Sequence, residues 1–145
     1  MSKMVGIERP RRRRRNDSPL EAKEQEFLFQ WAEDMAALKW PELRLMYHIP
    51  NGGSRNKIEA ANLKRQGVKA GVPDVCLPVP RGGYHGLYIE MKRRRGGVLS
   101  QDQRDYIDAL RAQGYRVETC KGFHPAADLI EEYMSEGVEK PHASV

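Results

Sequence analysis

Two apolar runs decide the fold of this chain: Asp74–Val79 (DVCLPV) and Leu87–Lys92 (LYIEMK). Their residue types predict two strands, and the turn residues between them predict an antiparallel hairpin. Side chains alternate between the two faces of a strand, so Glu90 and Lys92 share one face while apolar residues fill the other. Asp74 opens the first strand, where its carboxylate can meet that of Glu90 across the pair. The hairpin is therefore expected to gather two carboxylates and a lysine, the layout that metal-dependent phosphodiester chemistry needs.

Each of these residues alone has a simpler explanation. An Asp after Pro is common in turns, and Glu-x-Lys on a strand is typical of a solvated face. The joint pattern is more specific, because the acid and the base occupy one face of a strand that follows another strand headed by an acid.

The sequence on either side of the hairpin predicts helices over 20–38, 56–66, 100–113 and 125–134, and strands over 43–49 and 115–119. Ser18 and Pro19 suit the start of the first helix. That helix has apolar residues at helical spacing in Phe27, Leu28, Trp31, Met35 and Leu38. This order of elements predicts an α/β fold with a four-stranded mixed sheet flanked by helices.

A chain of 145 residues, 39% of them hydrophobic, is long enough for one compact domain. Its net charge of +5 suggests a polyanionic partner. Residues 1–16 contain seven basic residues and one acidic residue, a charge of +6, which leaves −1 for the rest. We therefore expect a disordered basic tail over 1–18, a domain over 19–136 and a flexible tail over 137–145.

Basic residues also cluster locally within the domain, and these clusters are expected to face DNA. Together with the tail, the candidate DNA-binding residues are Arg11, Arg12, Arg13, Arg14, Arg15, Arg55, Lys57, Lys64, Arg65, Lys69, Arg93, Arg94 and Arg95.

The two cysteines, Cys76 and Cys120, lie in apolar strands with no metal-binding spacing, so we expect buried free thiols in a reducing compartment. No apolar run has transmembrane length, and the basic N-terminus is not followed by a secretory apolar core. These features favour a cytoplasmic protein that does not associate with membranes.

Six short motifs follow one another along the chain: His48–Gly53 (HIPNGG), Leu63–Val68 (LKRQGV), Gly71–Asp74 (GVPD), Tyr88–Lys92 (YIEMK), Leu99–Gln103 (LSQDQ) and Gly114–Val117 (GYRV). In this order they resemble the VRR-NUC family, a branch of the PD-(D/E)XK nucleases common in bacteriophages. The resemblance runs from about residue 20 to residue 134. It implies a restriction-endonuclease-like core.

The resemblance implies a DNA endonuclease dependent on Mg²⁺ or Mn²⁺. Asp74, Glu90 and the backbone carbonyl of Met91 would hold the metal, and Lys92 would position or help to activate water. The family also places a glutamate of the first helix near the metal. Both Glu21 and Glu24 are candidates, and both equally suit the positive end of the helix dipole.

Two further residues have both a local explanation and a family one. Gln103 completes a capping box with Ser100, while relatives place such a glutamine beside the metal as part of the catalytic site. Asn51 suits a tight turn, while the family pattern places it near DNA.

Stand-alone family members resemble archaeal-type Holliday junction resolvases, which are two-fold dimers. The resemblance therefore implies a homodimeric, structure-selective endonuclease acting on four-way DNA junctions. The alternatives are a monomeric nuclease for flaps or nicked duplexes, an RNA-processing enzyme, and a nucleic-acid-binding module without catalysis. Retention of Asp74, Glu90 and Lys92 argues against the last of these.

Overall fold

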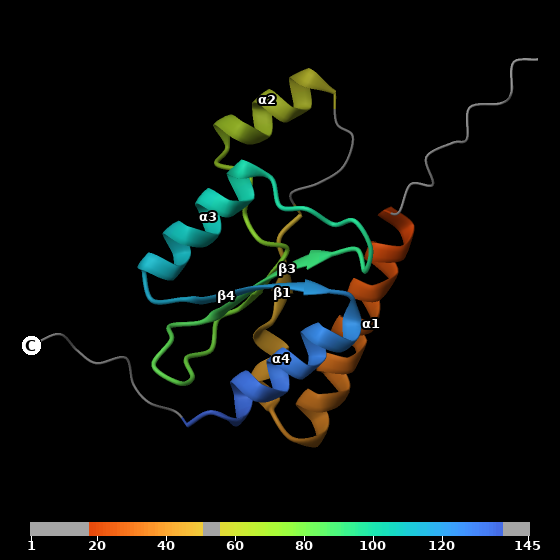
Figure 1. Cartoon of the computed structure of the whole chain (residues 1–145), viewed down its shortest axis with the longest axis vertical. Coiled ribbons are helices and arrows are strands. Elements are labelled where there is room, and N and C mark those ends of the chain that lie inside the picture. The colour runs from red at the N-terminus through yellow and green to blue at the C-terminus, as the bar shows by residue number, and fades with distance from the viewer. Residues whose placement is uncertain (1–17, 51–55, 138–145) are drawn as a thin grey trace, which may run out of the picture.

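The computed structural model describes residues 18–50 and 56–137. Within these ranges the chain forms a mixed sheet with helices around it (Figure 1), and its elements are, in order, α1 (Ser18–Leu38), the 3₁₀ helix η1 (Pro41–Leu45), β1 (Tyr47–His48), α2 (Lys57–Arg65), β2 (Val75–Leu77), β3 (Leu87–Lys92), α3 (Gln101–Ala112), β4 (Arg116–Lys121) and α4 (Phe123–Ser135). The predicted α/β fold is confirmed.

The four strands lie in the order β1-β2-β3-β4. The predicted hairpin is confirmed, because β2 and β3 pair antiparallel with Val75 opposite Ile89. β1 is antiparallel to β2, and β4 is parallel to β3, so the sheet is mixed. Continued by one residue, the β2–β3 register sets Asp74 opposite Glu90.

One face of the sheet carries the main hydrophobic core, where α1 and α4 pack side by side. Ile89 and Met91 of β3 are buried there, as are Leu28 of α1 and Ile130 of α4. The hydroxyl of Tyr133 on α4 donates a hydrogen bond of 2.5 Å to the carbonyl of Val79. This contact ties α4 to the chain that follows β2.

The other face of the sheet is covered by α3, which packs against β4. Ile107 of α3 and Val117 of β4 are both buried. Because alternate residues of a strand point to opposite faces, Glu90 and Lys92 of β3 face the α3 side. The site is therefore built between the sheet and the start of α3.

The predicted strand over 43–49 is mostly wrong. Residues Pro41–Leu45 form η1, and only Tyr47–His48 is a strand. Pro41 suits the first position of a helical turn, and η1 and the residue after it bury Leu43 and Met46 at i,i+3 spacing. Leu43 and Leu45 alternate as residues of a strand do, but this alternation does not reflect burial, since Leu45 is 56% exposed.

The core face of α1 matches the expected one in part, since Leu28 is buried and Trp31 and Met35 pack against the core. Leu28, Ala32 and Ala36 are buried, whereas Phe27 is 54% and Leu38 is 79% exposed. The small alanines allow α1 to approach the sheet closely, so the larger side chains at 27 and 38 are not needed in the core.

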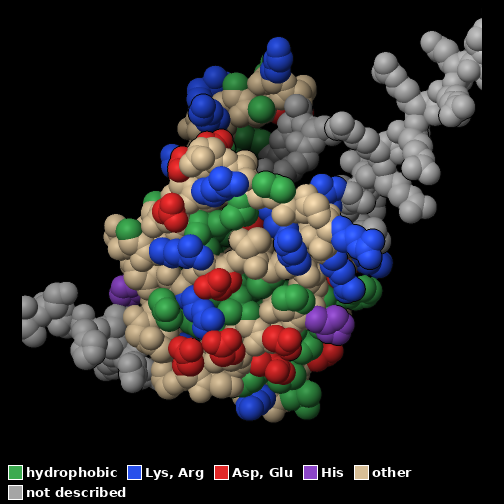
Figure 2. Space-filling model, viewed as in Figure 1, with side chains coloured by type: hydrophobic (Ala, Val, Ile, Leu, Met, Phe, Trp, Pro, Cys, Tyr) green, Lys and Arg blue, Asp and Glu red, His purple; other side chains and the backbone are tan. Residues whose placement is uncertain are grey.

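α2 has no buried residue and extends away from the body of the molecule (Figure 1). Asn56 is its N-cap, accepting a hydrogen bond from the Glu59 amide at 2.8 Å. The predicted glycine stop is confirmed, since Gly67 follows the helix with φ of +103°. Lys and Arg side chains gather on this helix, at the top of Figure 2.

Cys76 and Cys120 are buried free thiols, as predicted. Burial raises the pKa of Cys120 to about 11. Across the described residues, no helix has both the length and the apolar character required to cross a membrane. The predicted tails lie outside the described ranges, except for Ser18 at the start of α1 and Gly137 after α4.

Candidate active site

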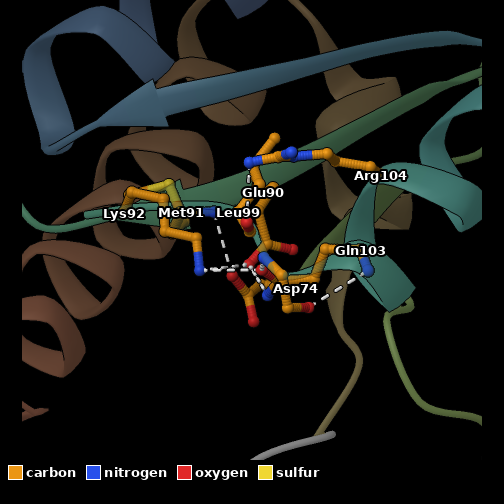
Figure 3. Close-up of polar contacts among 8 residues, drawn as sticks. Asp74, Glu90, Met91, Lys92, Leu99, Gln103 and Arg104 are labelled. Carbon is orange, nitrogen blue, oxygen red and sulfur yellow. Dashed lines mark hydrogen bonds and ion pairs between the residues drawn. The ribbon is translucent and has the colours of Figure 1, made fainter.

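Asp74, Glu90, Lys92 and Gln103 point toward one another on the α3 side of the sheet (Figure 3). Asp74 directly precedes β2, Glu90 and Lys92 lie on β3, and Gln103 lies in the first turn of α3. Residues from three elements thus converge at one place.

Asp74 is held by three hydrogen bonds, one to its carboxylate and two to its backbone carbonyl. The amide of Met91 donates to Oδ2 of Asp74 at 2.9 Å. The carbonyl of Asp74 accepts from the amide of Ile49 at 2.7 Å, and Nδ1 of His48 lies 2.8 Å from the same oxygen. His48 thus supports the position of Asp74 when Nδ1 carries the proton.

Gly71 brings the chain before Asp74 into contact with α3. It has φ of +84°, and a Cβ at this position would lie 2.3 Å from the backbone oxygen of Asp102. Only glycine accommodates both the left-handed backbone and this contact. The glycine therefore sets the distance between Asp74 and the helix that carries Gln103.

Glu90 is the most buried acidic residue of the site, at 3% exposure. Its Oε1 accepts a hydrogen bond from Nε2 of Gln103 at 2.9 Å and lies 3.5 Å from Nζ of Lys92. Its Oε2 is buried and has no hydrogen-bond partner among the described residues. A buried, unsatisfied carboxylate oxygen is costly unless a ligand or ion meets it.

The two carboxyl groups have raised pKa values. Burial is the main cause of the shift that raises the pKa of Glu90 to about 8, and the nearby charge of Asp74 adds to it. Burial also raises the pKa of Asp74, although the Met91 amide and other neighbours oppose this shift. Two acidic groups held together away from water disfavour double ionisation unless a cation lies near them.

The capping box predicted for Gln103 is confirmed, and the same side chain also contacts Glu90 and Lys92. The side-chain Oε1 of Gln103 accepts a hydrogen bond from the backbone amide of Ser100 at 2.9 Å. Its backbone amide donates to the hydroxyl of Ser100 at 3.2 Å, which completes the capping box. The same Oε1 accepts from Nζ of Lys92 at 3.1 Å. Gln103 thus fixes the start of α3 and links Lys92 to Glu90.

The structure separates the two glutamates of α1. Glu21 is close enough to the site for the charges of Asp74 and Lys92 to act on it, although burial is the main reason that its pKa is raised. Glu24 instead forms an ion pair with Arg94, at 2.6 Å to Nη2 and 2.7 Å to Nε. Of the two, Glu21 is therefore the one close enough to the carboxylates for their charges to act on it.

The candidate DNA-binding residues occupy two regions of the described chain. Lys57, Lys64, Arg65 and Lys69 lie on α2 or just after it, and Arg93–Arg95 follow β3 directly. The remaining candidates lie outside the described residues, namely Asn51, Arg55, Arg11, Arg12, Arg13, Arg14 and Arg15.

The arrangement of oxygens suits a hard divalent cation. Asp74 and Glu90 offer carboxylate oxygens, and Mg²⁺ prefers such ligands and keeps several waters. The described residues contain no cluster of three or more His, Cys, Asp or Glu side chains placed to hold a metal. Backbone oxygen and water would therefore complete the coordination around these two carboxylates.

Two features of this region had no signal in the sequence. No residue near His48 in the sequence has the spacing of a partner in a site. Only the pairing of β1 with β2 brings His48 to the carbonyl of Asp74. The pair between Glu24 and Arg94 joins residues 70 positions apart. Neither contact follows from local patterns.

Comparison with known proteins agrees with this geometry. The VRR-NUC domain model matches residues 20–124. A solved structure described as a VRR_NUC domain protein is 30% identical, with a TM-score of 0.73, and the comparison covers 86% of this chain and 96% of that chain. No curated protein matches. Because the family match spans most of the chain and includes the strands and helix that carry the site, the protein belongs to the VRR-NUC family of nucleases.

Proposed function

We propose that the protein is a metal-dependent DNA endonuclease whose site is formed by Asp74, Glu90, Lys92 and Gln103. The observation that carries this proposal is the buried Oε2 of Glu90, which has no hydrogen-bond partner among the described residues and belongs to a carboxyl group beside that of Asp74. Membership of a nuclease family supports the same assignment.

Asp74, Glu90 and the backbone carbonyl of Met91 would hold Mg²⁺ or Mn²⁺, with Glu21 nearby as a ligand through water. When bound, the cation supplies positive charge that neutralises the scissile phosphate and lowers the pKa of the attacking water. The raised pKa values of both carboxyl groups fit this role, because a site that disfavours two negative charges gains most from a cation.

Lys92 would act on the reacting phosphate, and Gln103 would position Lys92. The side chain of Lys92 is 16% exposed, and its Nζ lies within 3.5 Å of both Gln103 and Glu90. In this position its ammonium group can stabilise the negative charge that develops on the phosphate oxygens. Gln103 positions both Lys92 and Glu90 through opposite ends of its amide.

DNA recognition would be through the phosphate backbone. The basic residues lie on α2 or just after it and directly after β3, and none of the described elements presents a set of side chains suited to base-specific contacts. Affinity should therefore depend strongly on salt.

The preferred substrate is a branched DNA, and the working form is a homodimer that cuts a four-way junction. The resemblance of stand-alone VRR-NUC proteins to junction resolvases supports this part of the proposal. Two copies related by a two-fold axis would present two equivalent sites to opposing strands. Such a protein would act in the cytoplasm, where DNA is accessible.

The decisive experiment incubates the purified protein with labelled four-way, flap and linear DNA, in Mg²⁺ or in EDTA. We expect cleavage only with the metal, and its loss in Asp74→Ala and Lys92→Ala while DNA binding persists. Asp108→Ala, an exposed carboxylate on α3, is the matched control and should cut like the unchanged protein.

Cleavage by Asp74→Ala or Lys92→Ala at the unchanged rate would overturn the assignment of the site. Sedimentation at several protein concentrations tests the dimer. A monomer that cuts flaps faster than four-way junctions would replace the resolvase proposal with the monomeric flap nuclease.

A further inference from the structure

A pocket lies beside the proposed catalytic residues. It has a volume of about 500 Å³ and lies between the start of α1 and the segment that follows β3. Its lining includes Glu21, Glu24, Phe27, Arg93, Arg94 and Arg95. The volume falls within the range of sites that hold a small molecule of nucleotide size.

The pocket shares a wall with the catalytic site. Glu21 lines the pocket, and the charges of Asp74, Lys92 and Arg93 all act on it. Arg93 directly follows Lys92 along the chain. A DNA strand with its phosphate at the carboxylates would therefore place a neighbouring nucleotide at the pocket.

The ion pair between Glu24 and Arg94 holds these two residues of the pocket wall in place. The side chain of Glu24 is only 15% exposed, and its carboxylate contacts two nitrogens of the Arg94 guanidinium at 2.6 and 2.7 Å. Gly122, with φ of +95°, leaves room for this pair, since a Cβ there would lie 2.9 Å from Oε1 of Glu24. The pair neutralises Glu24, so an anionic ligand is not repelled by it.

Phe27 supplies an aromatic surface at this pocket. It is 54% exposed although it lies on a helix whose other face is buried in the core. Aromatic side chains next to arginines are the usual means of binding an unpaired base and its phosphate, with the ring stacking on the base. The basic residues of the pocket suit the binding of a phosphate, and the ring of Phe27 suits stacking on a base.

We propose that this pocket binds an unpaired nucleotide of the cleaved strand, with its base stacked on Phe27 and its phosphate held by Arg93 and Arg95, while Arg94 stays paired with Glu24. The inference rests on the proposed function and narrows its substrate to branched DNA that supplies an unpaired nucleotide next to the scissile phosphate, either in a single-stranded flap or where a base pair opens at the branch point of a four-way junction. A paired base cannot leave its stack without a cost of a few kcal/mol, so fully paired duplex is a poorer substrate.

The test uses a branched DNA whose cut position has been mapped, with an abasic tetrahydrofuran residue placed in turn at each nucleotide near the cut. At one position the abasic residue should slow cleavage roughly five- to hundredfold, the range that one base stacked on an aromatic ring contributes. Phe27→Leu should slow cleavage of the intact DNA by a similar factor, and Phe27→Tyr should restore it.

The coupling between these changes separates stacking from a structural role. With Phe27→Leu, the abasic residue should cause no further loss, because the stacking partner is already gone. An abasic penalty of the same size in Phe27→Leu and in the unchanged protein would overturn the proposal. So would unchanged cleavage of intact DNA by Phe27→Leu. Leu38→Ala, an exposed apolar residue at the far end of the same helix, is the control.

A binding measurement keeps this inference apart from the proposed function. A branched DNA with 2-aminopurine at the identified position, or at each candidate position in turn if no DNA is cut, is titrated in EDTA, where no hydrolysis occurs. Stacking on Phe27 should change its fluorescence, and Phe27→Leu should abolish the change. If the protein cuts no DNA but this change is observed, the nuclease proposal fails and the pocket remains. If no position gives a change that depends on Phe27, the pocket proposal fails.

Discussion

Nε2 of Gln103 donates a hydrogen bond of 2.9 Å to Oε1 of Glu90, although the two residues lie on different elements and the glutamine also caps its own helix. The other end of the same amide accepts from Lys92 at 3.1 Å and from the Ser100 backbone at 2.9 Å. Because one side chain makes all three contacts, the start of α3 and the orientation of the Glu90 and Lys92 side chains are coupled.

Replacing Gln103 by Ala should therefore affect both stability and catalysis. We expect a loss of about 1 kcal/mol in the free energy of unfolding, typical of a lost cap contact. Metal-dependent cleavage should fall by roughly 10- to 100-fold, because Lys92 and Glu90 lose the contact that positions them.

Ser100→Ala removes the other half of the capping box and is the control. It should lose similar stability while cleaving at the unchanged rate, and equal losses of activity in both variants would contradict the positioning role.

The stability of the metal-free protein should depend on pH through Glu90. Its pKa rises from an ordinary value of 4.5 to about 8 in the folded protein. Between these values the folded state holds more protons than the unfolded state, so the free energy of unfolding falls as pH rises. Glu90→Gln removes this ionisation and should be more stable than the unchanged protein in EDTA at pH 8, by on the order of 3 kcal/mol.

The advantage of Glu90→Gln should nearly disappear near pH 4.5, where Glu90 is protonated in the folded state and about half protonated in the unfolded state. Urea unfolding at pH 4.5, 6 and 8 in EDTA measures it. Asp108→Asn, at an exposed position of α3, provides the control curve. An advantage of the same size at every pH would mean that ionisation of Glu90 is not its cause.

Metal binding should be visible without any DNA. A cation that binds only the folded state raises the free energy of unfolding by about 2.7 kcal/mol when its concentration is 100 times its Kd. Thermal unfolding should therefore shift upward as Mn²⁺ or Mg²⁺ is added. Asp74→Asn keeps an acceptor for the Met91 amide but loses the charge, and it should abolish the shift. A shift of equal size in Asp74→Asn would place the metal elsewhere.

The sequence predicts those parts of the fold and site that depend on neighbouring residues. The alternation along β3 and its distance from Asp74 are sufficient to predict the hairpin, and the hairpin register brings Asp74 opposite Glu90. The spacing of Ser100 and Gln103 predicts the capping box, which the structure contains. In each case the relevant interaction is either local or formed across a short turn.

The parts that the sequence does not predict depend on tertiary packing. Leu43 and Leu45 alternate as in a strand, yet Pro41 begins a 3₁₀ turn because burying Leu43 and Met46 together is more favourable. The choice between Glu21 and Glu24 also could not be made locally, since both lie in the first turns of α1. It depends on where Arg94 reaches, and that is determined by how β3 ends beside α1.

Gly71 should tolerate no side chain. Ala at this position must adopt φ of +84° and would place its Cβ 2.3 Å from the Asp102 backbone oxygen. We expect Gly71→Ala to lose more than about 2 kcal/mol in the free energy of unfolding, together with most of the cleavage activity, since the contact positions Asp74 relative to α3.

Gly67→Ala is a close control, because Gly67 has φ of +103° but no atom within 4 Å of the added Cβ. It should lose only about 1 kcal/mol, the cost of the backbone conformation alone. Chemical unfolding of the two variants side by side gives the comparison, and equal losses would rule out a role for the contact with α3.

The basic residues of α2 should contribute to DNA affinity and not to catalysis. Lys64 and Arg65 lie on a helix with no buried residue, and Ala favours helix, so Lys64→Ala/Arg65→Ala should fold normally. If each residue contacts one phosphate, the slope of log K against log salt concentration should become shallower by roughly 2. Cleavage of DNA that is already bound, measured at saturating protein, should not change, because neither residue reaches the carboxylates.

Lys39→Ala is the control. Lys39 directly follows α1 and lies about 27 Å from Glu21 along the helix axis, so its loss should leave the salt slope unchanged. Equal salt slopes for the double variant and the unchanged protein would mean that α2 does not contact the phosphate backbone, and the contacts would then have to come from Arg93–Arg95 or from the N-terminal arginines.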